Sequence, residues 1–242
     1  MAQPPGGGRA VTAGHIHVNS ADPDAAIAFW CDVMGTSTYS LGSLRGVSTL
    51  GVTILFTQQS PSGPSAGSAI DRLAFRVPDI RTYVDRLSKA SPQTKPRNEG
   101  DSRLVFDAPD GVRIELVEDS STYAPLEFSR IHVNSAQPKP MQQWYATHFG
   151  ARTGIGDAAD SILIQGATLA LTQATSPVPT AGRAIDHLGF EVRDIQAFCN
   201  QLVENGVKLD SPPQVVPDLK ASIAFLTDPW GTRIELMEKT AR

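Results

Sequence analysis

The residues of this chain that could do chemistry are histidines and carboxylates on predicted β-strands. His15 and His17 alternate with apolar residues in the first predicted strand, so the two histidines share one face and the apolar side chains share the other. The same alternation places His187 and Glu235 opposite the apolar residues of two later strands. Ionisable groups on the inner face of a sheet are costly unless they line a wet cavity or bind something. The pattern therefore predicts a cleft lined by polar, ionisable residues.

These strands belong to a sequence that occurs twice. Residues 16–21 (IHVNSA) return as residues 131–136, 115 positions later, and residues 113–116 (RIEL) return as residues 233–236. A repeat of this length indicates a duplicated domain, because the periods of solenoid repeats are much shorter. The two copies can therefore be compared position by position.

The chain has 242 residues, enough for two cores of roughly 100–120 residues each. We expect a flexible tail over residues 1–13, a first domain over 14–118, a linker over 119–127 and a second domain over 128–240. Each copy divides again into two units with the order strand, helix and three strands. The sequence thus predicts an α+β fold of four βαβββ modules in two pseudo-symmetric halves, whose cupped mixed sheets form open barrels with the helices outside.

Capping residues mark the predicted helices. Asp22, followed by a proline, begins a helix that Gly35 ends. Asp79 caps a second helix that runs to about Ala90. Trp30 lies within the first of these helices, where we expect it to pack into the core.

Composition excludes several kinds of partner. The net charge is −4, and the chain contains no run of lysine and arginine with interleaved aromatics, so nucleic acid is not expected to bind. No apolar stretch approaches the roughly 20 residues that span a bilayer. The first residues lack the apolar core of a signal peptide, which makes a cytoplasmic protein the default, and an exported protein whose signal has been removed stays open. We expect a monomer or homodimer with a small-molecule substrate or ligand.

Three motifs together resemble the glyoxalase/bleomycin-resistance/dioxygenase superfamily, also called the vicinal oxygen chelate proteins. They are His15 with Phe29-Trp30 and Gly35, residues 186–195 (DHLGFEVRDI), and residues 228–236 (DPWGTRIEL). The resemblance covers the chain after residue 13, as two copies of the paired-module domain of the superfamily. The superfamily spans isomerases, ring-cleaving dioxygenases, thiol transferases, epimerases and non-catalytic drug-binding proteins, so the resemblance implies a fold and a group of functions.

The resemblance also implies where a metal would bind. In metal-using members, histidine and glutamate ligands lie on the first and last strands of the modules. The matching positions here, in chain order, hold His15, Arg72, Glu115, Arg130, His187 and Glu235. Neither copy alone therefore has two histidines and a carboxylate at these positions.

Crosswise pairing of the modules assembles a complete set. Modules one and four together supply His15, His187 and Glu235, whereas modules two and three supply an arginine–carboxylate cluster. Two histidines and one carboxylate suit one divalent metal, Fe, Mn, Ni or Zn, and leave coordination positions open for substrate oxygens. In this interpretation Glu235 is a ligand and also the catalytic base, and Arg72 and Arg130 meet near Glu115 in the other cavity.

A second interpretation uses the second copy alone. If the strand register slips by two residues, His132 replaces His15 as the first ligand, beside His187 and Glu235. In either case the substrate cleft is expected to be lined by His17, Asn19, Asn134 and His132.

The chain departs from the glyoxalase I pattern at one position. Glyoxalase I carries a fourth ligand, a glutamate, on the last strand of its first module. The corresponding strands here, residues 53–56 (TILF) and 168–171 (TLAL), contain no carboxylate.

Two functions follow from the sequence. The leading hypothesis is a divalent-metal-dependent enzyme that acts on a small oxygen-chelating substrate, as a lyase or isomerase or as a ring-cleaving dioxygenase. The alternative is a metal-free protein of the bleomycin-resistance type that binds and sequesters a small ligand.

Overall fold

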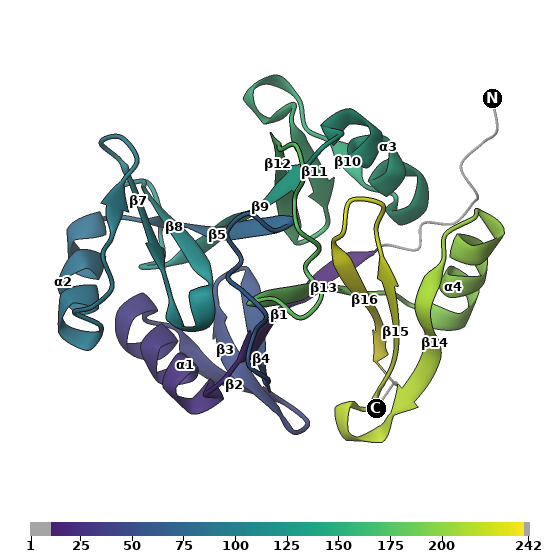
Figure 1. Ribbon diagram of the computed structural model, residues 1–242, viewed down its shortest axis with the longest axis horizontal. Coiled ribbons are helices and arrows are strands. Elements are labelled where there is room, and N and C mark those ends of the chain that lie inside the picture. The colour runs from purple at the N-terminus through teal and green to yellow at the C-terminus, as the bar shows by residue number, and fades with distance from the viewer. Residues whose placement is uncertain (1–10, 240–242) are drawn as a thin grey trace.

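The computed structural model describes residues 11–239 (Figure 1). Most of the predicted tail, and residue 240 of the predicted second domain, lie outside these residues. The first strand begins at Thr12, so the tail predicted over 1–13 is too long by two residues. The linker predicted over 119–127 likewise loses its last residue, Glu127, to a strand. Differences of one or two residues are usual at element ends.

The described chain contains four modules of the predicted order. The first consists of β1 (Thr12–Ser20), α1 (Pro23–Phe29) with a π-helical turn (Trp30–Met34), β2 (Ser37–Leu41), β3 (Leu44–Thr49) and β4 (Val52–Gln58). The second consists of β5 (Ile70–Val77), α2 (Ile80–Ala90), β6 (Arg97–Asn98), β7 (Arg103–Asp107) and β8 (Arg113–Glu118). The third consists of β9 (Glu127–Ser135), α3 (Pro138–Phe149), β10 (Arg152–Thr153), β11 (Ser161–Ile164) and β12 (Ala167–Gln173). The fourth consists of β13 (Ile185–Glu191), α4 (Ile195–Glu204), β14 (Leu209–Val216), β15 (Ala221–Thr227) and β16 (Arg233–Lys239).

The modules pair crosswise into two mixed sheets. One eight-stranded sheet, here called sheet A, has the order β14-β15-β16-β13-β1-β4-β3-β2 and joins modules one and four. The other, sheet B, has the order β10-β11-β12-β9-β5-β8-β7-β6 and joins modules two and three. Both are open sheets with free edges, and the predicted α+β class and crosswise pairing are confirmed. Each spatial half of the molecule is thus built from both copies of the repeat.

Helix ends follow the capping residues. The Asp22 side chain accepts a hydrogen bond from the amide of Ala25, and Gly35 ends the π-helical turn with φ of 72°, a left-handed conformation that suits glycine. The Asp79 side chain caps α2 in the same way, through the amide of Arg81. The predicted boundaries of these helices are therefore correct.

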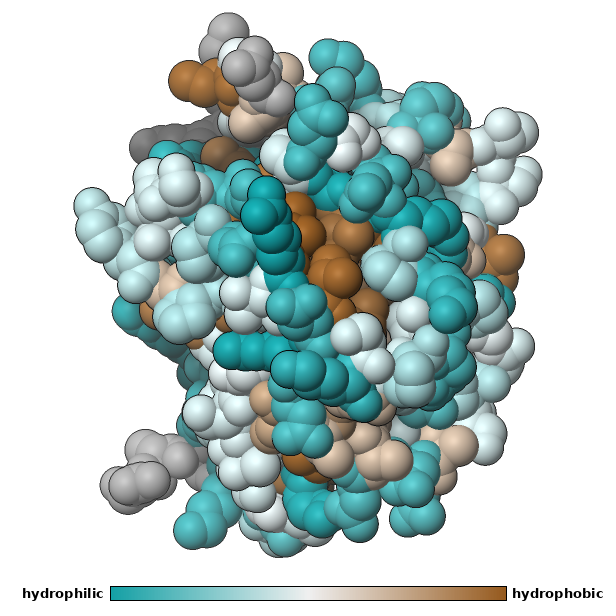
Figure 2. Space-filling view, turned by 90° about the vertical axis from the view of Figure 1, so that its left-hand side faces the viewer, coloured by the Kyte–Doolittle hydropathy of each residue, from teal (hydrophilic) through white to brown (hydrophobic). Residues whose placement is uncertain are grey.

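The apolar faces of the strands pack under the helices, as alternation predicts. Each helix contacts strands of its own module, and in Figure 1 the helices lie on the outside of the molecule. Trp30 is almost fully buried in this core. Figure 2 shows the face on the side of α2, where hydrophilic residues predominate around a small hydrophobic area. No helix among residues 11–239 is long and apolar enough to cross a membrane.

The strand that follows α4 contains two consecutive prolines, and its residue range was not predicted. Residues 212 and 213 lie in β14, and proline lacks the amide that a central strand must donate to its neighbour. β14 forms the edge of sheet A, and its register with β15 is irregular around the prolines. An edge position tolerates these residues because one side of the strand needs no partner.

Candidate metal centre

The centre of sheet A brings three distant parts of the sequence together. β13 lies between β1 and β16, antiparallel to the first and parallel to the second. In this register His15 lies opposite Gly189, and Gly189 lies beside Glu235. His17 lies directly opposite His187. His15 and His187 therefore lie on neighbouring strands of one sheet and not on two facing sheets, because β1 and β13 pair directly.

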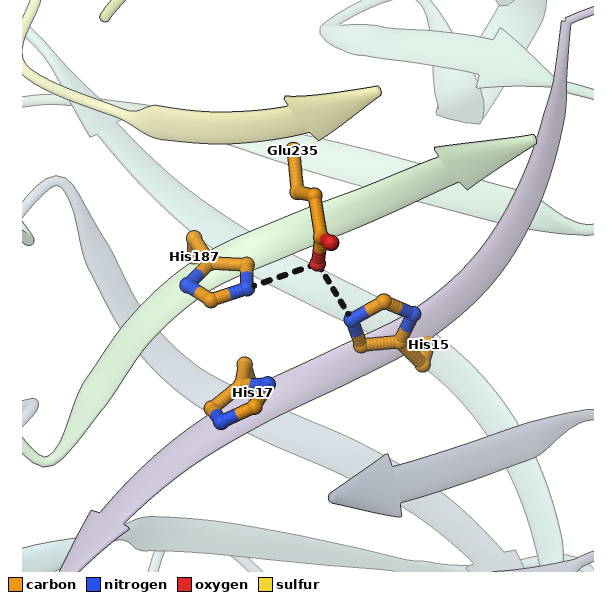
Figure 3. A group of neighbouring side chains, drawn as sticks. All are labelled: His15, His17, His187 and Glu235. Carbon is orange, nitrogen blue, oxygen red and sulfur yellow. Dashed lines mark hydrogen bonds and ion pairs between the residues drawn. The ribbon is translucent and has the colours of Figure 1, made fainter. Parts of the chain in front are cut away.

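The side chains of this group converge on one point (Figure 3). Oε2 of Glu235 lies 3.0 Å from Nε2 of His15 and 3.1 Å from Nε2 of His187. One nitrogen or oxygen from each of His15, His17, His187 and Glu235 lies within 4.8 Å of those of the other three. All four residues are buried, with exposures of 8%, 6%, 5% and 4% in that order. A metal ion with bond lengths of about 2.0–2.2 Å needs ligand atoms at most about 4.4 Å apart, so a small contraction would suffice.

A second carboxylate fixes the orientation of His187. Oδ1 of Asp186 lies 2.6 Å from Nδ1 of His187, which leaves Nε2 directed at Glu235. Asp186 also accepts hydrogen bonds from the Gly182 amide, the Asn19 side chain and the Arg233 guanidinium. Histidine ligands in metalloproteins are commonly held by a carboxylate in this way.

A β-bulge directs Asp186 to the side of His187. The register of β1 and β13 shifts between the pairs His17–His187 and Val18–Ile185, so that Asp186 is an extra residue. Simple alternation would place consecutive residues on opposite faces, and a bulge re-aims one of them. Asp186 could not be predicted from alternation for this reason, although residues 69–71 (AID) return as 184–186 in the repeat.

Burial and the contacts between these groups shift their pKa values in opposite directions. Burial alone would raise the pKa of Glu235, but the contacts with His15 and His187 hold it well below its usual range. Burial alone would lower the pKa of His187, but its hydrogen bonds to Asp186 and Glu235 raise it. The pKa of Asp186 is likewise low because of its hydrogen bonds, despite burial. Both carboxylates are therefore charged at neutral pH and attract a cation.

Gly189 makes room for the His15 ring. A Cβ atom built on Gly189 would lie 2.2, 2.3 and 2.7 Å from three atoms of that ring, far inside van der Waals contact. The ring therefore lies directly over the backbone of β13. The equivalent position in sheet B is Ala74, which lies opposite Arg130.

His17 is held by different neighbours. Its Nε2 lies 2.5 Å from Oγ1 of Thr57, and its ring stacks on that of His187 with the centroids 4.5 Å apart. Its Nδ1 is buried and has no hydrogen-bond partner among the described residues. Burial, with the nearby histidines, lowers the pKa of His17 to about 3, so the ring is neutral.

A pocket of about 280 Å³ opens beside these residues. It is lined by the predicted residues His17 and Asn19, and also by Arg233, whose guanidinium lies over the ring of Phe225 at 4.4 Å. A smaller pocket of about 90 Å³ is lined in part by His15. Space for a small molecule therefore adjoins the group.

The equivalent position in sheet B holds an ion-pair cluster. Oε2 of Glu115 lies 3.0 Å from Nε2 of His132 and 3.4 Å from Nε of Arg72. Burial alone would raise the pKa of Glu115, but His132 and the arginines lower it. No ion pair joins Arg130 to Glu115 among the described residues, contrary to expectation. Arg130 and Glu115 lie on strands on either side of Ala74, and His132 and Arg72 contact Glu115 instead.

This arrangement separates His132 from the candidate centre. His132 lies on β9 of sheet B, directly opposite Arg72, whereas His187 and Glu235 belong to sheet A. The strand register therefore does not bring the alternative set together. His132 and Asn134 also do not line the 280 Å³ pocket. Asn134 instead donates to the carbonyl of Ser68 in sheet B.

Comparison with known proteins agrees with this fold. A model of the Glyoxalase/Bleomycin resistance protein/Dioxygenase superfamily matches residues 12–116 and 128–236. The chain belongs to this superfamily. No curated protein sequence matches the chain.

The structure is similar to several solved structures at low sequence identity. Glyoxalase I from Zea mays aligns with a TM-score of 0.71 and 15% identity, over 95% of this chain and 92% of that one. A putative dioxygenase from Bacillus subtilis subsp. subtilis str. 168 aligns with a TM-score of 0.65 and 15% identity, over 97% of this chain and 87% of that one. Identities this low show a shared fold only, so the reaction must be inferred from the residues of the site.

Proposed function

We propose that this superfamily member is a divalent-metal-dependent enzyme acting on a small molecule with two neighbouring oxygen atoms. The observation that carries this proposal is the convergence of His15, His187 and Glu235 on one buried point beside a pocket. Imidazole nitrogens with one carboxylate suit Fe, Mn, Ni or Zn.

Three local features indicate that these polar residues bind a cation. Asp186 holds His187 with Nε2 aimed inward, Gly189 leaves space for His15, and the buried Nδ1 of His17 has no partner among residues 11–239. A buried polar atom without a partner is costly, and a cation at this point would offset that cost.

The chain's own residues then have separate roles. A bound divalent metal would act as a Lewis acid toward the substrate oxygens. Oε2 of Glu235 faces the histidines, and Oε1 makes no hydrogen bond among the described residues. This free oxygen is the group we assign as the base that takes a proton from the substrate. Asn19 and Arg233, which line the pocket, would orient the substrate.

Metal analysis tests the proposal directly. The protein is purified without added ions, reconstituted with Fe, Mn, Ni or Zn, and its bound metal is measured by mass spectrometry. We expect one ion per chain, lost in His15→Ala and in His187→Ala and retained in Arg72→Ala, which alters the equivalent position of sheet B. No retained ion in the unaltered protein after reconstitution would refute the proposal and favour the metal-free binding protein.

A substrate panel then narrows the reaction. Catechols, 2-oxoaldehyde adducts and acyl-thioesters, each assayed with each metal, represent the chemistries of the superfamily. Turnover that depends on both the metal and Glu235 would support the proposal, and unchanged turnover in Glu235→Gln would contradict the role of this residue.

A further inference from the structure

We infer that His17 is a fourth protein ligand, through Nδ1, and that the centre is therefore built for lyase or isomerase chemistry and not for ring cleavage by dioxygen. This inference rests on the metal-dependent function proposed above.

The first argument is the state of the two His17 nitrogens. Nε2 lies 2.5 Å from Oγ1 of Thr57, whereas Nδ1 is buried without a hydrogen-bond partner in the described part of the chain. Figure 3 shows a ring nitrogen of His17 on the side facing the other three residues. A hydrogen bond to one ring nitrogen commonly fixes the tautomer in which the other binds a metal. The Thr57 contact would therefore present the Nδ1 lone pair to the ion.

The second argument comes from the pseudo-symmetry of sheet A. β4 lies beside β1 as β16 lies beside β13, and both pairs are parallel. Glu235 is the neighbour of Gly189, and the residue in the matching place next to His17 is Leu55. Leu55 is fully buried and offers no ligand atom. The fourth ligand atom of the cluster therefore comes from β1 itself.

The number of ligands has a chemical consequence. Four protein ligands in an octahedral arrangement leave two positions, enough for the two neighbouring oxygens of one substrate. Oxygenases with two histidines and one carboxylate keep three positions open, which admit a chelating substrate together with dioxygen. A centre with three histidines and Glu235 has no such third position. Its fitting substrate is a chelating molecule that reacts by proton transfer, without dioxygen.

The test counts imidazole ligands without relying on activity. X-ray absorption spectra of the zinc-loaded full chain report the number of bound imidazoles from their multiple-scattering signature. We expect three imidazoles in the unaltered protein, two in His17→Ala and three in His132→Ala. His132 is the matched control because it occupies the same place in the repeated hexapeptide and lies beside Glu115 in sheet B.

The outcomes separate this inference from the proposed function. If the unaltered protein binds zinc with two imidazoles, His17 is not a ligand, although the metal-dependent function stands. If it binds no metal, the proposed function itself fails. The number of imidazoles bound to zinc in the unaltered protein tests the inference even if His17→Ala does not fold. Dioxygen uptake by the iron-loaded protein with a catechol, measured with an oxygen electrode, would also overturn the assignment to lyase or isomerase chemistry.

Discussion

Replacing Gly189 with alanine should expel His15 from the candidate metal centre. The new Cβ would lie 2.2 Å from the nearest atom of the His15 ring, whereas ordinary contacts begin near 3.4 Å. The ring must therefore move by about 1 Å, roughly half of a metal–nitrogen bond of about 2.0–2.1 Å. A displacement of this size removes one imidazole from the ion. Disturbing only the groups that orient a ligand already costs about 10–100-fold in metal affinity, so we expect at least a 100-fold loss.

The assay is a competition titration against a chromophoric chelator, with zinc or manganese. The matched control is Ala74→Gly at the equivalent position of sheet B, which should leave the affinity unchanged. The backbone at position 189 is ordinary strand, and overpacking of this kind costs about 1–3 kcal/mol, so the variant should stay folded by circular dichroism. A folded Gly189→Ala protein with unchanged metal affinity would refute the assignment of His15 as a ligand.

Three further outcomes are expected. Asp186→Asn should weaken metal binding about 10–100-fold by releasing His187, as measured by the same titration. The control is Asp71→Asn, at the position of sheet B equivalent to Asp186, which should leave metal binding unchanged. Equal effects of the two substitutions would contradict the orienting role of Asp186. Metal affinity should rise with pH, because the pKa of His187 is raised and its proton must leave before the ion binds. By the same linkage, protonation of His187 stabilises the metal-free protein at pH values below the pKa of this histidine in the unfolded chain, and the stabilisation is lost as pH rises through its raised pKa in the folded protein. Urea unfolding at several pH values measures this change in the free energy of unfolding, after subtraction of the same measurements on His187→Gln. Trp30→Ala should cost about 3–5 kcal/mol in urea unfolding, because this side chain is almost fully buried, and a loss below 1 kcal/mol would contradict its place in the core.

The repeat made the large features predictable. At each of the two histidine positions, comparison of the copies found a histidine in one and an arginine in the other, and crosswise pairing followed from that contrast. Strand alternation predicted that His15 and His17 share the face opposite the apolar residues. Both are consequences of local sequence, because the side-chain period of a strand and the order of the elements depend little on distant parts of the chain.

The features that could not be predicted depend on how distant strands align. The pairing of His17 with His187 requires the register of β1 against β13. The part played by Asp186 requires a bulge in that same register, and the packing of His15 requires Gly189 directly opposite it. Alternation along a single strand contains no information on any of these alignments. The expectation that Arg130 meets Glu115 was wrong for the same reason, since it depends on how β8 and β9 align on either side of β5.

The two sheets show how few side chains separate a metal centre from an ion-pair cluster. Each sheet has a β-bulge in the pairing of its two central strands, at Asp186 in sheet A and at Asp71 in sheet B. Where sheet A has His187, sheet B has Arg72, whose guanidinium lies near both Asp71 and Glu115. A buried carboxylate needs a nearby cation, and Arg72 is a permanent one. Within residues 11–239, in contrast, the ion-pair partners of Glu235 are His15 and His187, with no arginine or lysine. A bound cation would stabilise the negative charge of a carboxylate that is buried among imidazoles. We assign the metal to sheet A because Glu235 lacks the arginine partner that Glu115 has.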